Sequence, residues 1–298
     1  TLGFSLDVSK ENTDGYRRNN RFRQANVAGT LEARPDGGRA YLRFALGDQN
    51  LQLPGALTEA QIAADPRQTS SPGNDSDRKD GTVTLGGSFS AGRHEFAADF
   101  SYRDKHATAL FLPAFFVDTR ADLKSFAPRA KLRFDAFGRQ HAVTVGLDLE
   151  EWGYASRSAA SPATLATPFS RRIGEQTNQA LYAQANLWAA ERTRFVMGGR
   201  TQRTRERLAE QVFPADDRRA EHSLDAYEVA LRQGLGAGWS AYAKSGTSFR
   251  VANFDENACF FPPCAAVLLD PQEARAGELG LEYEGAGRRG RVAMYDMR

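Results

Sequence analysis

The chain carries the sequence VTVGLDLE at residues 143–150, in which every second residue is apolar. Successive side chains of a β-strand point to opposite faces of its sheet, so this stretch predicts a strand with one apolar and one polar face. The same alternation recurs in four other stretches: LGFSLDVS at 2–9, TVTLGGSF at 82–89, EFAADFSY at 95–102 and ELGLEY at 278–283. The chain therefore reads as an all-β protein.

The connections between these strands alternate between short and long. Six short turns, most of them with glycine, are expected at 35–38, 91–93, 136–139, 190–192, 235–238 and 284–287. Glycine supplies the backbone conformations that tight hairpins require. Longer polar connections are expected near 10–22, 50–79, 105–123, 157–174, 207–221 and 249–271. This arrangement predicts about 13 antiparallel strands, many of them near the 9–11 residues that cross a bilayer at a tilt.

Short turns at one end and long loops at the other are typical of outer-membrane barrels, with the short turns in the periplasm and the long loops outside. A soluble sandwich would place turn signals at both ends, and it is the less favoured alternative. The mean hydropathy of −0.54 agrees with a barrel because lipid-facing and lumen-facing residues alternate and cancel. The longest apolar runs fall well short of the roughly 20 residues of a membrane helix.

The charge and the cysteine content limit the classes of partner and the cellular compartment that are expected. The 298 residues carry a net charge of +2 without a basic block, which argues against nucleic-acid binding. The two cysteines, Cys259 and Cys264, form a single C-x4-C pair for which a local disulfide is expected, with free thiols as the alternative. A disulfide implies an oxidising compartment such as the periplasm or the cell surface.

An odd strand count indicates part of a larger barrel. Single-chain bacterial barrels contain even numbers of strands, and an open sheet edge in lipid leaves backbone groups unpaired. Residue Thr1 begins directly in a strand-like pattern without a signal peptide, and Arg298 lies within another such pattern. We therefore expect a sheet that forms an arc of a larger barrel, from a chain that is either mature or cut from something longer.

Three stretches resemble TonB-dependent outer-membrane receptors. The first is SFRVANFDE at 248–256, similar to the family's aromatic-Arg-x-Pro-Asn-x-x-Glu segment with Ala252 in place of proline. The second is LDPQE at 269–273 followed by AGELGLEY at 276–283, with Gln272 inserted after the proline. The third runs from Leu53 to Gln68 and resembles a loop helix of siderophore receptors.

The resemblance implies the later part of a barrel of about 22 strands with a plugged lumen. Residues 1–298 would then be a partial barrel domain without the plug, the TonB-contacting segment and the last strands. It also implies a location in the bacterial outer membrane, in contact with lipid and lipopolysaccharide. The resemblance further implies that the intact protein imports a scarce solute actively, with a ferric siderophore as the expected class, and contacts TonB through the N-terminal region.

Other functions are compatible with the same pattern. A passive porin would close on itself with an even strand count, and a structural or adhesive surface barrel would have no plug. A receptor for a non-iron cofactor, or for a glycan, would share the whole architecture. We expect no enzyme activity, because nothing orients a nucleophile or base near Asp255, Glu256, Glu273 and Glu278. We expect Glu278 on the lumen face, opposite to Leu279.

The candidate ligand contacts are arginines and aromatic residues near the long loops. They are Arg120, Arg250, Phe260 and Phe261, of which the two phenylalanines lie between the cysteines. Guanidinium groups pair with anionic chelates, whereas a structural role for Arg250 or loop packing of the phenylalanines are the alternatives. Further loop arginines are Arg17, Arg18, Arg21, Arg171 and Arg172, for which lipopolysaccharide phosphates are other possible partners.

Two further sets of residues complete the sequence pattern. The run from Leu110 to Phe116 is interpreted as an outer aromatic girdle, as loop packing or as a ligand contact. The four histidines, at 94, 106, 141 and 222, lie on separate segments, so we expect neither a cofactor nor a metal site in the protein itself. Any iron would arrive as a chelate.

Overall fold

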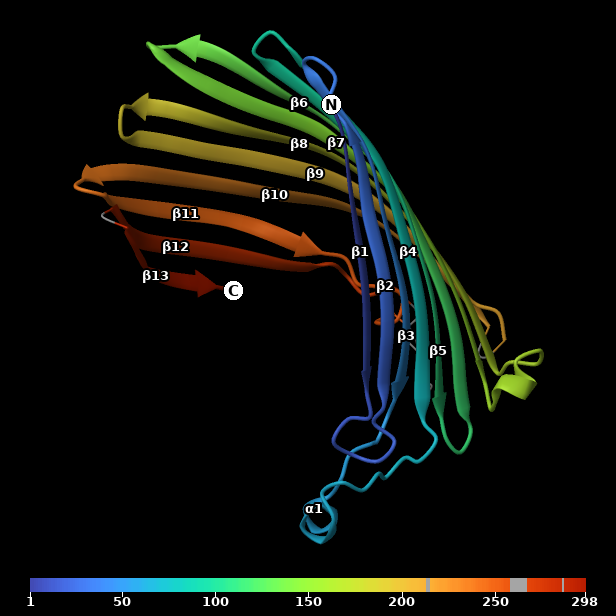
Figure 1. The fold of residues 1–298 in the computed structure, drawn as a ribbon. Helices are drawn as coiled ribbons and strands as arrows, with labels where there is room; N and C mark the ends of the chain where they lie inside the picture. Colours follow the sequence, from blue (N-terminus) through green and yellow to red (C-terminus); the bar gives the residue numbers. More distant parts are fainter. Residues whose placement is uncertain (213–214, 258–266, 286) are drawn as a thin grey trace.

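The computed structural model describes residues 1–212, 215–257, 267–285 and 287–298. It contains thirteen strands that form one antiparallel sheet in chain order, each paired with the next (Figure 1). The strands are β1 Leu2–Thr13, β2 Phe22–Ala33, β3 Gly38–Gln52, β4 Asp75–Ala91, β5 His94–Phe111, β6 Phe115–Ala136, β7 Arg139–Ala159, β8 Ser170–Ala190, β9 Thr193–Glu210, β10 Asp216–Gly236, β11 Trp239–Arg250, β12 Gln272–Gly285 and β13 Arg288–Met297.

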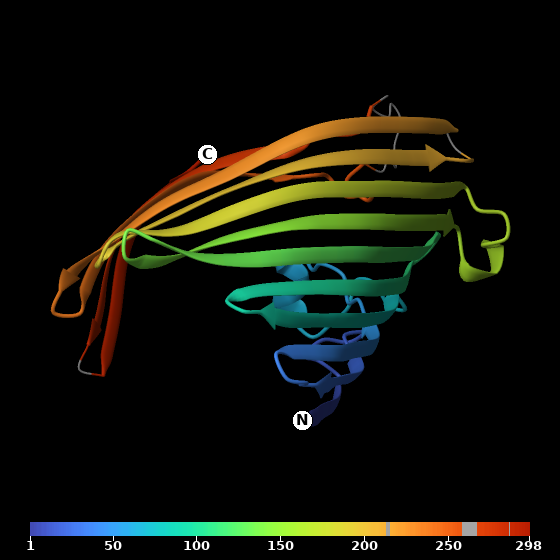
Figure 2. The same ribbon diagram turned by 90° about the horizontal axis from the view of Figure 1, so that it is seen from above.

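The sheet curves into an arc in which β1 and β13 are separate edges (Figure 2). The prediction of an open arc of about 13 antiparallel strands is therefore confirmed. Helix is confined to connections: α1 covers Glu59–Ala64, and a single 3-10 turn covers Pro162–Thr164. The helix lies within the stretch that resembles a loop helix, and a capping box between Thr58 and Gln61 starts it. None of the described helices has the length and apolar character needed to cross a membrane.

The strand register sorts the side chains onto two faces. Leu147 of β7 pairs with Leu181 of β8, and Leu85 of β4 pairs with Phe100 of β5. These apolar residues share one face, which we call the outer face, and Leu85 keeps 60% of its surface exposed. Most exposed large apolar residues of the strands lie on this face. In water such a surface would be strongly unfavourable, so it is the face that lipid covers.

The opposite, inner face is polar, and it contains a repeated tyrosine–glycine pair. Tyr41 lies opposite Gly86, and Tyr182 lies opposite Gly146. A Cβ atom built on either glycine would come within 2.4 Å of the tyrosine ring. Tyr242 covers Gly280 in the same way. Glycine at these positions lets an aromatic ring lie flat across the neighbouring strand, and the ring in turn shields the exposed backbone.

The six short turns lie where the sequence predicts them. Aromatic rings contact one another on the outer face beside these turns. Phe89 and Phe96 stack at 5.1 Å and Phe134 and His141 at 5.3 Å, whereas the rings of Trp239 and Tyr283 are tilted by 51° with centroids 4.9 Å apart. A row of aromatic side chains at one end of the apolar band is typical of a membrane–water interface. The end with short turns therefore lies at one boundary of the bilayer.

The strands are longer than predicted, because they continue past the apolar band. β7 has 21 residues, about twice what a tilted crossing requires. The expected loops 105–123 and 207–221 are mostly strand: only residues 112–114 separate β5 from β6, and β10 begins at Asp216, six positions after β9 ends. In these segments polar and charged residues occur on both faces, so the regular apolar alternation that marks a strand is lost.

Ion pairs fill the outer face of this extension. Arg207 Nε lies 3.0 Å from Asp217 Oδ1, and Arg205 Nε lies 3.1 Å from Glu221 Oε2. Arg203 also pairs with Glu221, and Arg219 with Asp217. Exposed charges in such number are incompatible with a hydrocarbon environment. This half of the strands, on the side of the long connections, therefore projects beyond the membrane.

Candidate functional site

The connection between β11 and β12 begins with a tight turn held by one carboxylate. The guanidinium of Arg250 makes a bidentate contact with the Glu256 carboxylate, which also accepts the Asn253 backbone N–H at 2.8 Å. The Glu256 N–H donates in return to Asn253 Oδ1 at 2.9 Å. The Asn253 N–H and Arg250 hold the pKa of Glu256 below its ordinary value, since both stabilise the ionised carboxylate.

Two side chains within this turn, those of Phe254 and Asp255, contact the inner face of the sheet. The Phe254 ring lies over Gly174 of β8, where a Cβ atom would come within 2.7 Å of it. The Tyr154 hydroxyl of β7 donates to Asp255 Oδ1 at 2.6 Å, and the Tyr154 and Phe254 rings lie 5.1 Å apart. Tyr154 also forms a small apolar cluster with Leu208 and Leu268, against which Phe254 packs. The connection is therefore anchored to three strands distant in sequence.

A cavity of about 480 Å³, which we call the inner pocket, opens between this segment and β5–β9. Its volume is in the range of small-molecule sites. Its lining includes the aromatic residues Trp152, Tyr154 and Phe254, the amides Gln176, Asn178 and Gln202, and the cation Lys105. The pocket lies beyond the apolar band, because the residues after Leu149 on the outer face of β7 include Glu151 and Arg157. It therefore lies in the half of the strands on the side of the long connections.

A hydrogen-bonded ladder fixes the polar side of the inner pocket. Asn178 Nδ2 donates to Glu150 Oε2 at 2.9 Å, and the Trp152 indole N–H donates to the same oxygen at 3.3 Å. Asn178 Oδ1 accepts from Gln176 Nε2 at 3.1 Å and from Thr204 Oγ1 at 2.9 Å. Satisfied partners hold such side chains in single orientations, which is the condition for a preformed binding surface.

The two arginines that the sequence suggests as ligand contacts, Arg120 and Arg250, do not line the inner pocket. Arg250 lies at its margin, but its guanidinium is engaged by Glu256. Arg120 is not in a loop: it belongs to β6, between Thr119 and Ala121, which line the inner pocket. Because neighbours in a strand face opposite sides, Arg120 points to the outer face. Ligand contact by either arginine stays a prediction, and the structure brings neither guanidinium into the pocket.

The cysteine loop and its aromatic residues lie outside the described residues. This concerns the expected disulfide between Cys259 and Cys264 and the candidate contacts Phe260 and Phe261. These expectations stay predictions.

The other arginines of the long connections make contacts in different parts of the structure. Arg17 ties two long connections together, since its guanidinium donates to the carbonyls of Pro54, Gly55 and Gln68. Arg18 pairs with Asp65 at 2.7 Å, and Arg172 is buried on the inner face against Glu210. The run around Phe111 packs at the loop tips: Phe115 lies 6.1 Å from both Phe111 and Phe169. Loop packing is thus observed for this run, far from a girdle position.

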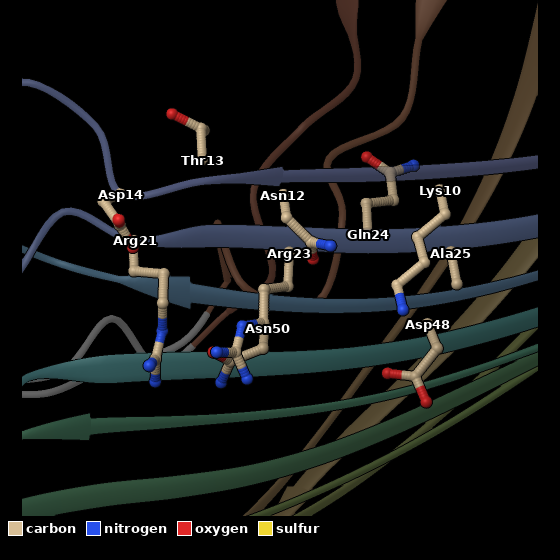
Figure 3. A pocket seen from close by; sticks show the side chains of 10 residues that line it. All are labelled: Lys10, Asn12, Thr13, Asp14, Arg21, Arg23, Gln24, Ala25, Asp48 and Asn50. Atoms are coloured by element: carbon tan, nitrogen blue, oxygen red, sulfur yellow. The ribbon is translucent and has the colours of Figure 1, made fainter.

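A second hollow, of about 600 Å³, lies near the N-terminal edge of the sheet. Figure 3 shows Lys10, Arg23 and Asp48 extending from β1–β3 to one side, whereas Thr13 points the opposite way. The small side chain of Ala25 leaves the space between them. These cations lie on the outer face, directly beyond the apolar residues Val8, Val27 and Leu46. The hollow is therefore at the level of the lipid head groups.

The carboxylates and histidines of the sequence pattern are separated in space. Glu278 is on the inner face, as its strand position predicts, with Lys244 Nζ at 2.9 Å. His106 contacts Asp118 at 2.7 Å on the outer face, and His141 contacts the Ala136 carbonyl at 2.9 Å. Within the described ranges, no group of three or more acidic, histidine or cysteine residues is placed to bind a metal.

Sequence reasoning missed the residues that form the inner pocket. Lys105 and Gly174 lie in the segments 105–123 and 157–174, for which the sequence predicts long connections, and Trp152 follows the alternating stretch 143–150. Their alternation is masked by polar residues on both faces. A signal was nevertheless present: Gly153 and Gly174 interrupt polar strands, and a glycine within a strand often marks close approach of another segment.

Comparison with known proteins identifies the architecture. Residues 4–298 match the family model described as TonB dependent receptor-like, beta-barrel. The unliganded ferric citrate transporter FecA superposes with a TM-score of 0.84 at 15% identity, over 99% of this chain and 46% of FecA. The ferric yersiniabactin uptake receptor FyuA from Yersinia pestis gives 0.76 at 15% identity, over 99% of this chain and 49% of FyuA.

The alcaligin outer membrane receptor FauA from Bordetella pertussis gives 0.77 at 14% identity, over 100% of this chain and 46% of FauA. No curated protein sequence matches the chain. The chain thus spans about half the length of these solved structures, and at such identities the likeness shows the fold. Together with the family match over nearly all residues, this shows that the chain belongs to the TonB-dependent receptor β-barrel family.

Proposed function

We propose that this chain is the barrel part of an outer-membrane receptor that takes up a ferric siderophore. The observation that carries the proposal is the inner pocket, which opens on the side of the long connections within a barrel of this family. FecA and FyuA, which share the fold, are described as a ferric citrate transporter and a ferric yersiniabactin uptake receptor. The ligand would reach the pocket from outside the cell.

Active transport would require the rest of the receptor. The intact protein would close the arc into a barrel of about 22 strands, hold a plug in the lumen and contact TonB through its N-terminal region. The residues described here would supply the lumen wall and the outer loops. The chain on its own would bind ligand weakly and would not transport, because the plug contacts and the energy-coupling segment would be missing.

The test is iron uptake by cells that express the intact receptor in a background without other siderophore receptors. We expect uptake of a ferric chelate that stops when TonB is deleted or the inner membrane is de-energised. Equal uptake in both conditions would identify a passive porin instead. Binding without uptake would favour a surface-binding barrel, and rescue by a non-iron cofactor would replace the siderophore with that solute.

We also propose lipopolysaccharide as the lipid that contacts the outer face. Lys10 and Arg23 border the outer hollow at head-group level, where cations pair with phosphate. Replacing both by glutamine in the intact receptor should lower the amount of lipopolysaccharide that co-purifies. The matched control is Lys131→Gln, because Lys131 lies on the inner face. Unchanged co-purification in the double variant would exclude this contact.

A further inference from the structure

Three of the four aromatic residues that line the inner pocket, Trp152, Tyr154 and Phe254, offer ring faces and few free polar atoms. The Tyr154 hydroxyl is engaged by Asp255 at 2.6 Å, and the Trp152 indole N–H is engaged by Glu150 at 3.3 Å. The Phe254 ring is tilted by 30° to the Tyr154 ring and is held in place over Gly174. What remains available in this part of the pocket is apolar aromatic surface, which favours a flat ring as the bound group.

The amide side of the pocket is polar but neutral. Gln202 Nε2 donates to Thr204 Oγ1 at 3.0 Å, while Gln202 Oε1 accepts from Arg200 at 2.8 Å. The Arg200 guanidinium also pairs with Asp148, so its charge is compensated inside the protein. Amides in such a ladder can exchange hydrogen bonds with hydroxyl or carbonyl groups of a ligand, but they cannot neutralise a cluster of carboxylates.

Among the described residues, one cation that lines the pocket has no ion-pair partner. Lys105 lies on the inner face of β5, opposite Ala121 of β6, and it forms no ion pair within the described part of the chain. Arg103, two residues earlier on the same face, pairs with Leu123 in the register and does not line the pocket. A single lysine matches one negative oxygen on the bound group. The one acidic side chain of the lining, Asp255, would repel further negative charge.

We propose that the inner pocket binds an aromatic arm of the iron chelate, a ring that bears phenolic oxygens of which one pairs with Lys105. Stacking on Trp152 and on the Tyr154–Phe254 pair would hold the ring, and the amides would bind its polar substituents. Polycarboxylate and hydroxamate chelates, which lack such a ring, would be bound poorly. This inference rests on the proposed uptake of a ferric chelate and specifies its chemical class.

The test uses the intact, plug-containing receptor in detergent, titrated by calorimetry with three iron(III) complexes. These are the complexes of 2,3-dihydroxybenzoylglycine, of citrate and of a linear trihydroxamate. We expect the aromatic complex to bind at least tenfold more tightly than the other two. Trp152→Leu and Lys105→Gln should each lower its affinity about tenfold. Lys131→Gln, an exposed inner-face lysine near the short-turn end, should leave it unchanged.

The outcomes separate this inference from the proposed function. Tight binding of citrate or hydroxamate complexes with weak binding of the aromatic one would overturn the inference and leave iron uptake intact. Binding of iron-free 2,3-dihydroxybenzoate in a Lys105-dependent manner, without binding of any ferric complex, would support the aromatic pocket and overturn iron uptake. Should Trp152→Leu fail to fold, Lys105→Gln still decides, because Lys105 is exposed and packs against no core.

Discussion

The Phe254 ring occupies the space above Gly174 that a side chain would otherwise fill, since a Cβ atom there would lie 2.7 Å from the ring. At other glycines of the inner face, such as Gly86 and Gly146, the covering ring comes from the tyrosine of the paired strand. Tyr154 is the strand partner of Gly174, but here the ring comes from the β11–β12 connection. Because Gly174 has no side chain, the β11–β12 connection can pack against the sheet through Phe254.

Replacing this glycine by alanine should displace the loop. Gly174→Ala forces the Phe254 ring to move, and overpacking of this kind costs about 1–3 kcal/mol. The ligand affinity of the intact receptor should fall with it, because Phe254 lines the inner pocket. Thermal unfolding and ligand titration measure the two effects. Gly199→Ala on β9 is the control, since the nearest atom to its Cβ would be 3.9 Å away.

The Tyr154–Asp255 hydrogen bond should contribute to the same coupling. Tyr154→Phe removes the hydroxyl that donates to Asp255 at 2.6 Å and should lower the stability of the docked connection by about 1 kcal/mol. A double-mutant cycle with Asp255→Ala, which removes the acceptor oxygen, isolates the interaction. Tyr227→Phe, at an exposed outer-face position, serves as the reference. Additive effects of the two substitutions would show that the bond carries no coupling energy.

The turn that Arg250 and Glu256 close should stay intact at a lower pH than a turn held by a glutamate with an ordinary pKa. The pKa of Glu256 is held below its ordinary value of 4.5, so its stabilising contacts are complete above that value and are lost only as the pH falls through the lowered pKa. Ligand affinity should therefore be constant from pH 7 down to about 4.5 and decrease below.

Glu256→Gln tests this account. The amide cannot ionise, so the variant should bind less tightly at neutral pH, and the decrease on acidification should be smaller than in the original protein. Glu273→Gln provides the matched control, because Glu273 is an exposed glutamate of β12 outside the turn that Glu256 closes. An unaltered pH profile in Glu256→Gln would show that another group is responsible for the loss.

The membrane-spanning half of the sheet could be predicted from sequence, and the site could not. Alternation in stretches such as 143–150 arises because lipid contacts one face only, and this pattern located the strands and the short turns. Beyond the bilayer both faces carry polar residues, so the exposed Arg205 of the outer face and the buried Glu206 of the inner face are adjacent in a strand without apolar alternation. The strand ends of β5, β6, β9 and β10 were therefore mistaken for loops.

The pocket depends on contacts between segments far apart in the chain. Tyr154 and Asp255 are separated by 101 positions, and neither belongs to a periodic pattern that would pair them. The sequence around Arg250 resembles a family motif, but only the structure shows that its arginine and glutamate close a turn. Local patterns report which face of a strand meets lipid. They carry no information on which loop returns to which strand.

The assignment of the outer face predicts that an arginine substitution has very different effects at two positions of β7. Leu147→Arg places a charge in the middle of the apolar band, where the cost is about 2–4 kcal/mol. Thr144→Arg, three residues earlier, places the same side chain on the inner face, where water or polar groups can solvate it. The fraction of heat-modifiable, folded barrel in outer membranes should drop for Leu147→Arg and stay near the original level for Thr144→Arg. Equal losses in the two variants, or a larger loss for Thr144→Arg, would contradict the lipid-facing assignment, because charge alone would then not distinguish the faces.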